Sequence, residues 1–502
     1  MDEKKQGWTA FLLLICVCIT LGAVIPIGYS FGVINAPAQF IRLWIFESAQ
    51  SRYSTVLGDS QLTTLMACVA SMFQVGGIVG SLVAPGCNTK LGRKGSLLVS
   101  GALLTVAAIL QLFCRMASSV EMLLLGRLTG GIGAGLVYTT QPMYLVELAP
   151  AELSGSVGVF TCIGITGGVV VGQFFSFDFL LGTSKHWHCA LGGYVILVII
   201  GLAPLLWFPE SPRYLMSKGN RGKTRAILVR LRKSEQRVDT ELAEIEAALA
   251  VAVEKSSMAD VIRNSKLTMP LIIVCSFHLV QQMSGINAIW LYSVSIFTDA
   301  GFTLEVALWL NFAEGVLNFF VALFGPWMMA SFNRRIMMML SCLFSSIFLS
   351  LLSVGLELMS SYQKVSYGCI LFLSLYIVAF NLGLGPMPFF IGSGEYPKCA
   401  CAMFITLWPI DRDLRGVATS RCNGLGQPDQ LAIQLSAWHG VPPPAVGHWT
   451  VCLYTLLSDM PLWIPPDLPL LAGDQEPQSQ GCGAFAAERP QVEDQVKQKV
   501  KN

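Results

Sequence analysis

The chain has 502 residues, of which 53% are hydrophobic and only 13% are charged. Soluble globular proteins carry about 25% charged residues, so this composition excludes a set of water-soluble domains and indicates a polytopic membrane protein. The net charge of +2 gives no reason to expect a nucleic acid or another polyanion as a partner.

Ten apolar segments are long enough to cross a bilayer as helices. A spanning helix needs about 20 mostly apolar residues. Continuous apolar runs also differ from the alternating pattern of a membrane barrel. The predicted spans are residues 8–30, 61–84, 95–115, 120–146, 155–181, 189–208, 269–297, 303–330, 335–358 and 365–393.

A polar segment separates the first six of these spans from the last four. Residues 209–268 contain twelve Lys and Arg and eight Asp and Glu, and their acidic stretch is typical of a soluble helix. The chain is therefore predicted to comprise a first transmembrane half (1–208), a cytoplasmic helical linker domain (209–268), a second transmembrane half (269–395) and an atypical tail (396–502).

The distribution of basic residues predicts the orientation, because Lys and Arg favour cytoplasmic loops. With the N-terminus in the cytoplasm, the loops on that side carry 19 Lys and Arg, and the opposite loops carry 5. We therefore expect a cytoplasmic N-terminus and a cytoplasmic linker domain.

The two halves joined by a polar segment are typical of secondary transporters, whose substrate site lies at mid-membrane between the halves. Small residues spaced three or four apart, such as Gly76 and Gly80, let helix backbones approach closely in lipid. The alternative for any one of these glycines is that it serves packing alone.

Seven short motifs occur in order at the ends of the predicted spans or within them. They are Gly32-Val33-Ile34-Asn35, Leu91-Gly92-Arg93-Lys94, Gly126-Arg127-Leu128, Pro142-Met143-Tyr144-Leu145-Val146-Glu147, Pro209-Glu210-Ser211-Pro212-Arg213-Tyr214-Leu215, Gln281-Gln282-Met283-Ser284-Gly285-Ile286-Asn287-Ala288 and Gly385-Pro386-Met387-Pro388. Together, over residues 8 to about 395, they resemble the facilitative hexose transporters, in the sugar-porter branch of the major facilitator superfamily.

The resemblance implies an all-α polytopic membrane protein of major facilitator type. Two helical halves, six spans and an incomplete four, would surround a central cavity, and the cytoplasmic helical linker would join them. The implied function is facilitative transport (uniport) of a hexose such as glucose or fructose by alternating access.

Carboxamides inside apolar spans are the candidate sugar ligands. An unpaired amide in hydrocarbon is costly, so each must face a cavity or another helix, and amides both donate and accept as sugar hydroxyls require. By resemblance, the substrate-binding positions are Gln173, Gln281, Gln282, Asn287, Asn318 and Phe389, the last of which stands where many relatives have Trp. The alternative role of the amides is hydrogen bonding between helices.

The resemblance also implies a latch on the cytoplasmic side. In the family, several of the corresponding charges pair across helices and hold the inner gate closed, whereas Ser154-Gly155 and the loop 330–335 depart from the family pattern. The gating positions are Arg93, Lys94, Arg127, Glu147, Glu210, Arg213, Arg334 and Arg335. For Arg93 and Lys94, the alternative is ordinary cytoplasmic positive charge.

Pro386 and Pro388 interrupt the last predicted span, because proline lacks a backbone N–H donor. Such a break is tolerated in a membrane helix where neighbouring groups satisfy the freed carbonyls. We predict a hinge at these prolines, and a fixed kink is the alternative.

The mechanism is predicted to be passive. Proton-linked sugar porters carry an Asp after the Gly-Tyr pair of the first span, and here Ser30 follows Gly28-Tyr29. The alternative is a proton-coupled symporter that uses Glu314, since an intramembrane carboxyl is a functional candidate by default. Glu314 lies one turn before Asn318, hence on the same helix face.

The sequence does not indicate an enzyme. Its five His form no metal cluster, and its 15 Cys have neither zinc spacing nor a disulfide framework. We expect no cofactor and no metal site. The expected partners are the sugar and the lipid bilayer, and the expected location is the plasma membrane, by analogy with the family.

The segment from residue 396 departs from the family pattern, in which two further spans follow. Residues 397–502 hold twelve of the 24 prolines and only short apolar pieces, a composition typical of irregular chain. We expect a transporter whose second half lacks spans eleven and twelve. The alternatives are a sugar sensor that does not transport and an inactive truncated isoform.

Overall fold

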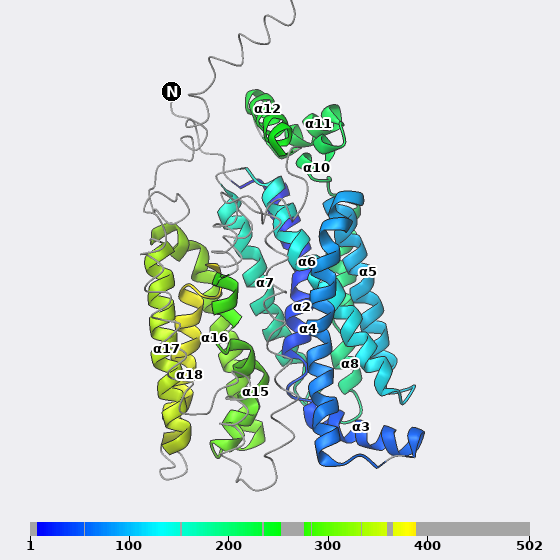
Figure 1. Cartoon of the computed structure of the whole chain (residues 1–502), viewed down its shortest axis with the longest axis vertical. Coiled ribbons are helices and arrows are strands. Elements are labelled where there is room, and N and C mark those ends of the chain that lie inside the picture. Colours follow the sequence, from blue (N-terminus) through cyan, green and yellow to red (C-terminus); the bar gives the residue numbers. More distant parts are fainter. Residues whose placement is uncertain are drawn as a thin grey trace, which may run out of the picture.

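The computed structural model describes residues 8–54, 56–150, 153–232, 235–252, 276–282, 284–332, 334–358 and 365–387. Within these ranges every regular element is a helix, which confirms the all-α prediction. Two groups of long helices stand side by side, with α7 facing the second group, and three short helices cover one end (Figure 1).

The first half contains the spans that precede the polar segment. Its elements are α1 (Ala10–Ile19), η1 (Thr20–Val24), α2 (Ile25–Gly32), α3 (Ala38–Tyr53), α4 (Asp59–Lys90), α5 (Gly92–Phe113), α6 (Val120–Leu148), α7 (Ser154–Phe175), α8 (Trp187–Gly192), α9 (Val195–Leu202) and η3 (Ala203–Leu206). The π-helical turn η1 interrupts the first span just before Pro26, which has no N–H to continue the helical ladder.

Close approach of helix backbones explains two of the glycine positions. A Cβ on Gly131 of α6 would overlap the Phe73 carbonyl of α4, and a Cβ on Gly28 of α2 would overlap the Ile165 carbonyl of α7. Only glycine allows these contacts, so α4 with α6 and α2 with α7 form close helix pairs of the kind common in membranes.

The second half has its own core. Its elements are α15 (Ile286–Asp299), α16 (Leu304–Ser331), α17 (Arg334–Leu358) and α18 (Val365–Leu382). Phe297 and Tyr376 are buried in this core, whereas Tyr29, Tyr144 and Trp187 are buried in a separate core of the first half. Each half is therefore packed around its own apolar interior.

Nine helices in the described part of the chain are long and apolar enough to span a membrane, from Ala10–Gly32 to Val365–Leu382. They match nine of the ten predicted spans. The remaining prediction, 269–297, is only partly described. The predicted tail, from residue 396, lies outside the described residues, and the domain limits stay predictions.

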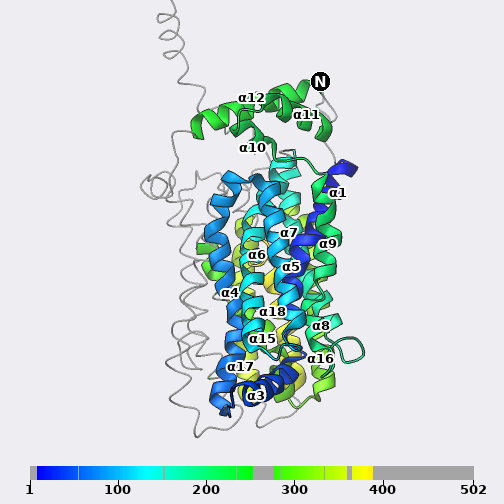
Figure 2. The ribbon, with the colours of Figure 1, turned by 90° about the vertical axis from the view of Figure 1, so that its right-hand side faces the viewer.

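The linker segment forms a small helical unit at one end of the molecule. It consists of α10 (Pro212–Ser217), α11 (Arg221–Leu231) and α12 (Glu235–Ala252), packed around a core of Met216, Leu228, Val238, Leu242 and Ile245. Figure 2 shows this unit at the same end as the start of α1, with α3 at the opposite end. This arrangement agrees with the N-terminus and linker sharing one side of the membrane.

Candidate substrate-binding site and gates

The two halves meet where α7 packs against α16. Gln173, near the end of α7, donates from Nε2 to the Asn311 carbonyl of α16 at 3.3 Å. Gln173 also packs on Gly315, where a Cβ would overlap its Oε1 atom. The glycine therefore makes room for an amide that joins one half to the other.

Further contacts close this interface toward the end of the molecule that holds α3. The rings of Phe177 and Trp309 lie with centroids 4.5 Å apart. Asn35, just before α3, donates from Nδ2 to the Trp290 carbonyl of α15 at 2.6 Å. The halves are thus in direct contact on the side opposite the linker helices.

Gln281 contacts the point where α18 ends. Its Nε2 atom donates to the carbonyls of Leu384 and Gly385, both at 2.9 Å. Helix α18 ends at Leu382, and residue 388, which would bond the Leu384 carbonyl in a continued helix, is a proline without an N–H. The helix break therefore frees a carbonyl that the Gln281 amide uses.

Pro386 lies in the turn after α18 and is buried. In a helix its ring would clash with the carbonyl of residue 382, which is where α18 ends. Its role as a hinge stays a prediction. Pro388 and Phe389 lie outside the described residues.

Two more polar pairs join α16 to α18. Asn381 donates from Nδ2 to Oδ1 of Asn318 at 2.5 Å, and Ser374 donates from Oγ to Oε1 of Glu314 at 2.6 Å. Asn311, Glu314, Asn318 and Asn381 are all at least 94% buried. These groups, with Gln281, form a polar strip along the α16–α18 contact.

Two carboxamide oxygens in this region are buried without a hydrogen bond. They are Oε1 of Gln173 and Oε1 of Gln281, for which the described residues place no donor at bonding distance. The His278 side chain lies one turn before Gln281 and interacts with that amide. Leaving a buried acceptor unpaired costs about 1–3 kcal/mol, so each oxygen is ready to accept a hydrogen bond from a bound molecule.

Three of the six predicted substrate positions, Gln173, Gln281 and Asn318, thus lie buried at helix contacts around α16 and α18. Gln282 is also buried, at 7% exposure. Asn287 lies in α15, but its side chain is outside the described part of the structure. Sequence reasoning missed Asn311 and Asn381, although the criterion of an amide in an apolar span selects both.

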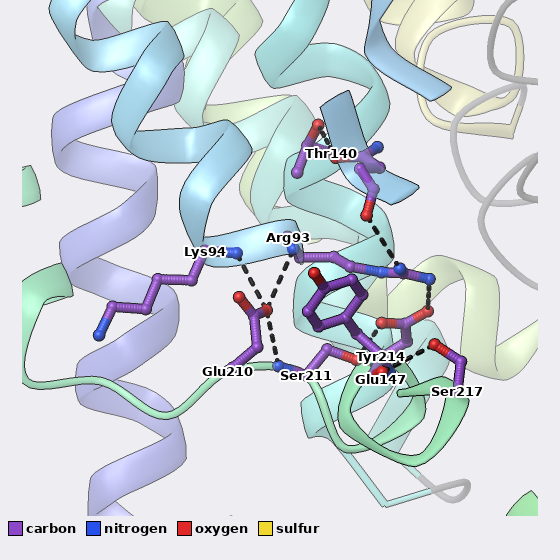
Figure 3. A network of polar contacts seen from close by, with 9 residues as sticks. Arg93, Lys94, Thr140, Glu147, Glu210, Ser211, Tyr214 and Ser217 are labelled. Carbon is purple, nitrogen blue, oxygen red and sulfur yellow. Dashed lines mark hydrogen bonds and ion pairs between the residues drawn. The ribbon is translucent and has the colours of Figure 1, made fainter. Parts of the chain in front are cut away.

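A polar network joins the linker to the ends of α5 and α6 (Figure 3). Arg93 and Glu147 form an ion pair at 2.8 Å, with side chains 17% and 6% exposed. The other carboxylate oxygen of Glu147 accepts from the Ser211 hydroxyl. The Arg93 guanidinium also lies 5.7 Å from the centre of the Tyr214 ring.

Glu210 caps the start of α5 within the same network. Its Oε1 atom accepts from the backbone N–H groups of Arg93, Lys94 and Ser211 at 3.0, 3.1 and 2.8 Å. A carboxylate is favoured here because the first N–H groups of a helix have no partner within it. Lys94 donates from Nζ to the carbonyls of Leu206 and Phe208.

Arg127 does not join this network, which corrects its grouping with the cytoplasmic charges. It lies in α6 twenty residues before Glu147, about 30 Å along the helix. Its guanidinium donates to the carbonyls of Val69 at 3.1 Å and Ser30 at 2.9 Å. The motif match gave its position in the chain but not its depth in the bundle.

Three predicted gating residues remain, namely Arg213, Arg334 and Arg335. Arg213 is exposed and makes no ion pair within the described residues. Arg334 and Arg335 begin α17, but their side chains are not among those described. Their gating roles stay predictions.

Arg232 is a structural residue that the sequence did not single out. It binds both carboxylate oxygens of Glu241 on α12, at 2.9 and 2.7 Å, and donates to the Leu148 carbonyl at 2.8 Å. It is 5% exposed. No motif or periodicity separated this arginine from its eleven basic neighbours in the linker.

Comparison of the sequence with known proteins identifies related transporters. The family model described as "Sugar (and other) transporter" matches residues 15–400. The mouse protein "Solute carrier family 2, facilitated glucose transporter member 7" is 33% identical over 380 residues, covering 75% of this chain and 74% of its own length. The human facilitated glucose transporter member 3 is 31% identical over 389 residues, covering 77% and 78%.

Solved structures show the same fold. The major facilitator proton:xylose symporter XylE bound to 6-bromo-6-deoxy-D-glucose superposes with a TM-score of 0.73 at 20% identity, covering 91% of this chain and 96% of that one. The partially occluded inward-open form of the xylose transporter XylE from E. coli gives a TM-score of 0.67 at 21% identity, with 91% and 98% covered. The predicted major facilitator fold is confirmed.

The extent of the family match and the identity to its curated members lead to one conclusion. This chain belongs to the sugar transporter family and has the major facilitator fold, and it is an integral membrane transporter rather than an enzyme.

Proposed function

We propose that the chain is a uniporter that carries a hexose, such as glucose or fructose, by alternating access. The observation that carries the proposal is the pair of carboxamides whose nitrogens are bonded and whose oxygens are not. Gln173 is held by the Asn311 carbonyl and Gln281 by those of Leu384 and Gly385, while both Oε1 atoms have no hydrogen-bond partner among the described residues.

A sugar hydroxyl would supply the missing donor to each oxygen, because a hydroxyl donates one hydrogen bond and accepts others. Anchored amide nitrogens keep the oxygens in place, which lowers the entropy cost of binding. Gln282, Asn287, Asn318 and Phe389 complete the proposed site. The names of the curated relatives, which are facilitated glucose transporters, support a hexose as cargo.

A passive mechanism is supported by the surroundings of Ser30. Its hydroxyl donates to the Pro26 carbonyl at 2.9 Å, and its own carbonyl accepts from Arg127. Serine does not titrate at physiological pH, so this position offers no carboxyl to carry a proton beside the arginine. The downhill gradient of the sugar would then be the sole driving force.

Alternating access is supported by the way that the contacts are distributed. The α7–α16 contact closes the side that bears α3, which we propose is extracellular. The Arg93, Lys94, Glu147 and Glu210 network is the proposed cytoplasmic latch, with Arg213, Arg334 and Arg335 as further members and Pro386 and Pro388 as the hinge. The proposed location is the plasma membrane, with a cytoplasmic N-terminus.

Uptake of labelled glucose and fructose into proteoliposomes containing the full chain tests the proposal. We expect saturable flux that Gln173→Leu and Gln281→Leu each reduce at least about tenfold, which corresponds to about 1.4 kcal/mol of lost interaction. Gln111→Leu removes a buried amide of α5 and is the matched control, expected to keep flux.

The outcomes separate the alternatives. Sugar binding without flux supports a sensor, and absence of both binding and flux in a folded protein supports an inactive isoform. Uphill accumulation of sugar driven by a pH gradient would show that transport is coupled rather than passive.

A further inference from the structure

Glu314 is a carboxyl group that the proposed uniport mechanism does not use. It is the eleventh residue of α16, about 15 Å along the helix from its first residue, and it is 5% exposed. An ionised carboxylate at such a depth is stable only when it is paired or fully hydrogen bonded.

Among the described helices, those that pack most extensively against α16 carry no positive charge. These are α7, α15 and α18, and none of them contains Lys, Arg or His. Their titratable residues are Cys162, Tyr292, Asp299, Tyr367, Cys369 and Tyr376, and α16 itself adds only Glu305, at its exposed start. No side chain on these helices can therefore neutralise an ionised Glu314.

The hydrogen bonds of Glu314 are also too few for an anion. Oε1 accepts one bond, from Ser374 at 2.6 Å, and Oε2 is buried with no partner among the described residues. An ionised carboxylate offers about four acceptor sites. A protonated carboxyl, in contrast, is neutral and needs far less solvation.

We propose that Glu314 holds a proton in the closed arrangement described here, and that loss of this proton regulates transport by favouring a state in which the carboxylate is hydrated. The proposal rests on the proposed transport function and adds a pH control to it. In this proposal the proton is not carried across the membrane with the sugar, so no uphill transport results.

The direction of the effect follows from which form is buried. A protonated Glu314 lets α16 pack against α7 and α18, whereas an ionised Glu314 opposes that packing. Each cycle must pass through a state in which these helices close, so ionisation raises the barrier. Sugar flux is therefore expected to fall as the pH rises.

The first test measures the protonation of Glu314 directly. Dicyclohexylcarbodiimide reacts with protonated carboxyls in apolar surroundings, and mass spectrometry of the labelled full-length protein in liposomes locates the adduct. We expect labelling at Glu314 that falls severalfold from acidic to alkaline buffer, and none at the exposed Glu305. Unchanged labelling across the range, or none at Glu314, would overturn the proposal.

The second test measures equilibrium exchange of labelled glucose, with the same pH on both sides of the membrane. Wild-type exchange should fall severalfold toward alkaline pH, and Glu314→Gln should stay at the acidic rate throughout. Glu305→Gln, on the same helix, should keep the wild-type profile. Ser374→Ala removes a donor to the carboxylate, so the decline should move to higher pH.

Two further results distinguish this proposal from an amino-sugar site and from failure of the proposed transport function. The alternative is that the ammonium group of an amino sugar, rather than a proton, neutralises Glu314. The wild type would then prefer glucosamine over glucose and Glu314→Gln would not, and this result would overturn the proposal. If no variant moves sugar, the transport function fails while the carbodiimide labelling still decides whether Glu314 is protonated.

Discussion

Arg232 and Glu241 form a doubly bonded ion pair that also holds the end of a membrane helix. The two contacts, 2.9 and 2.7 Å long, leave one guanidinium nitrogen to bond the Leu148 carbonyl at the end of α6. Because the planar guanidinium is buried, this one side chain fixes α12 to the transmembrane bundle.

Replacing Arg232 by Ala is expected to loosen the linker unit. The change leaves the Leu148 carbonyl without its donor and Glu241 without its cation. We expect the free energy of unfolding to fall by about 1–3 kcal/mol. Limited proteolysis should show faster cleavage within residues 212–252, and the unfolding temperature should fall. Arg221→Ala breaks a pair whose arginine is 66% exposed, so this control should change stability by less than about 1 kcal/mol.

The pair of Arg93 and Glu147 should show measurable coupling. A double-mutant cycle with Arg93→Ala and Glu147→Ala is expected to give about 1–3 kcal/mol of interaction energy, since both side chains are largely buried. Chemical unfolding of the first half measures it. The exposed pair of Arg42 and Asp59, at 3.3 Å, should give a value near zero in the same assay. Equal values for the two pairs would contradict the latch.

Gly131→Ala should destabilise the first half by about 1–3 kcal/mol, because its Cβ would overlap the Phe73 carbonyl on α4. Gly86→Ala is the matched control on α4, where an added Cβ meets nothing within 4 Å. That change should be neutral or slightly stabilising, since alanine favours a helix. Thermal unfolding in detergent compares the two.

For the Asn318 and Asn381 pair, we predict that the double substitution is less destabilising than the single one. Asn381→Leu leaves the buried Asn318 Oδ1 without its donor and should cost about 1–3 kcal/mol. The double change to leucine removes both polar groups, so its stability should exceed that of the single variant. Sugar flux should nevertheless fall in the double variant, because Asn318 belongs to the proposed site.

The sequence predicted the positions of the membrane helices because each is a long apolar run, and nine are present in the described residues. Amide positions such as Gln173 and Gln281 were found because polar groups in such runs are conspicuous. The partners of these amides could not be predicted. The Asn311 and Leu384 contacts are with backbone carbonyls, which carry no sequence signal.

Charged residues were predicted less well. The resemblance grouped Arg93, Arg127 and Glu147 without naming their partners; Arg93 and Glu147 form an ion pair, whereas Arg127 lies twenty residues before Glu147 on α6, outside their network. Its partners are again backbone carbonyls, of Val69 and Ser30. Arg232 was missed because its burial depends on tertiary contacts with α6 and α12.

The linker helices are tied to the first half at several separate points. The Tyr214 hydroxyl donates to the Lys90 backbone carbonyl, and the Arg232 guanidinium donates to the Leu148 carbonyl. The centre of the Phe11 ring lies 4.3 Å from the Arg230 guanidinium. In the proposed alternating-access cycle, this small unit is therefore expected to move together with the first half. A label on α12 and one on α4 should therefore keep a constant separation while sugar is carried.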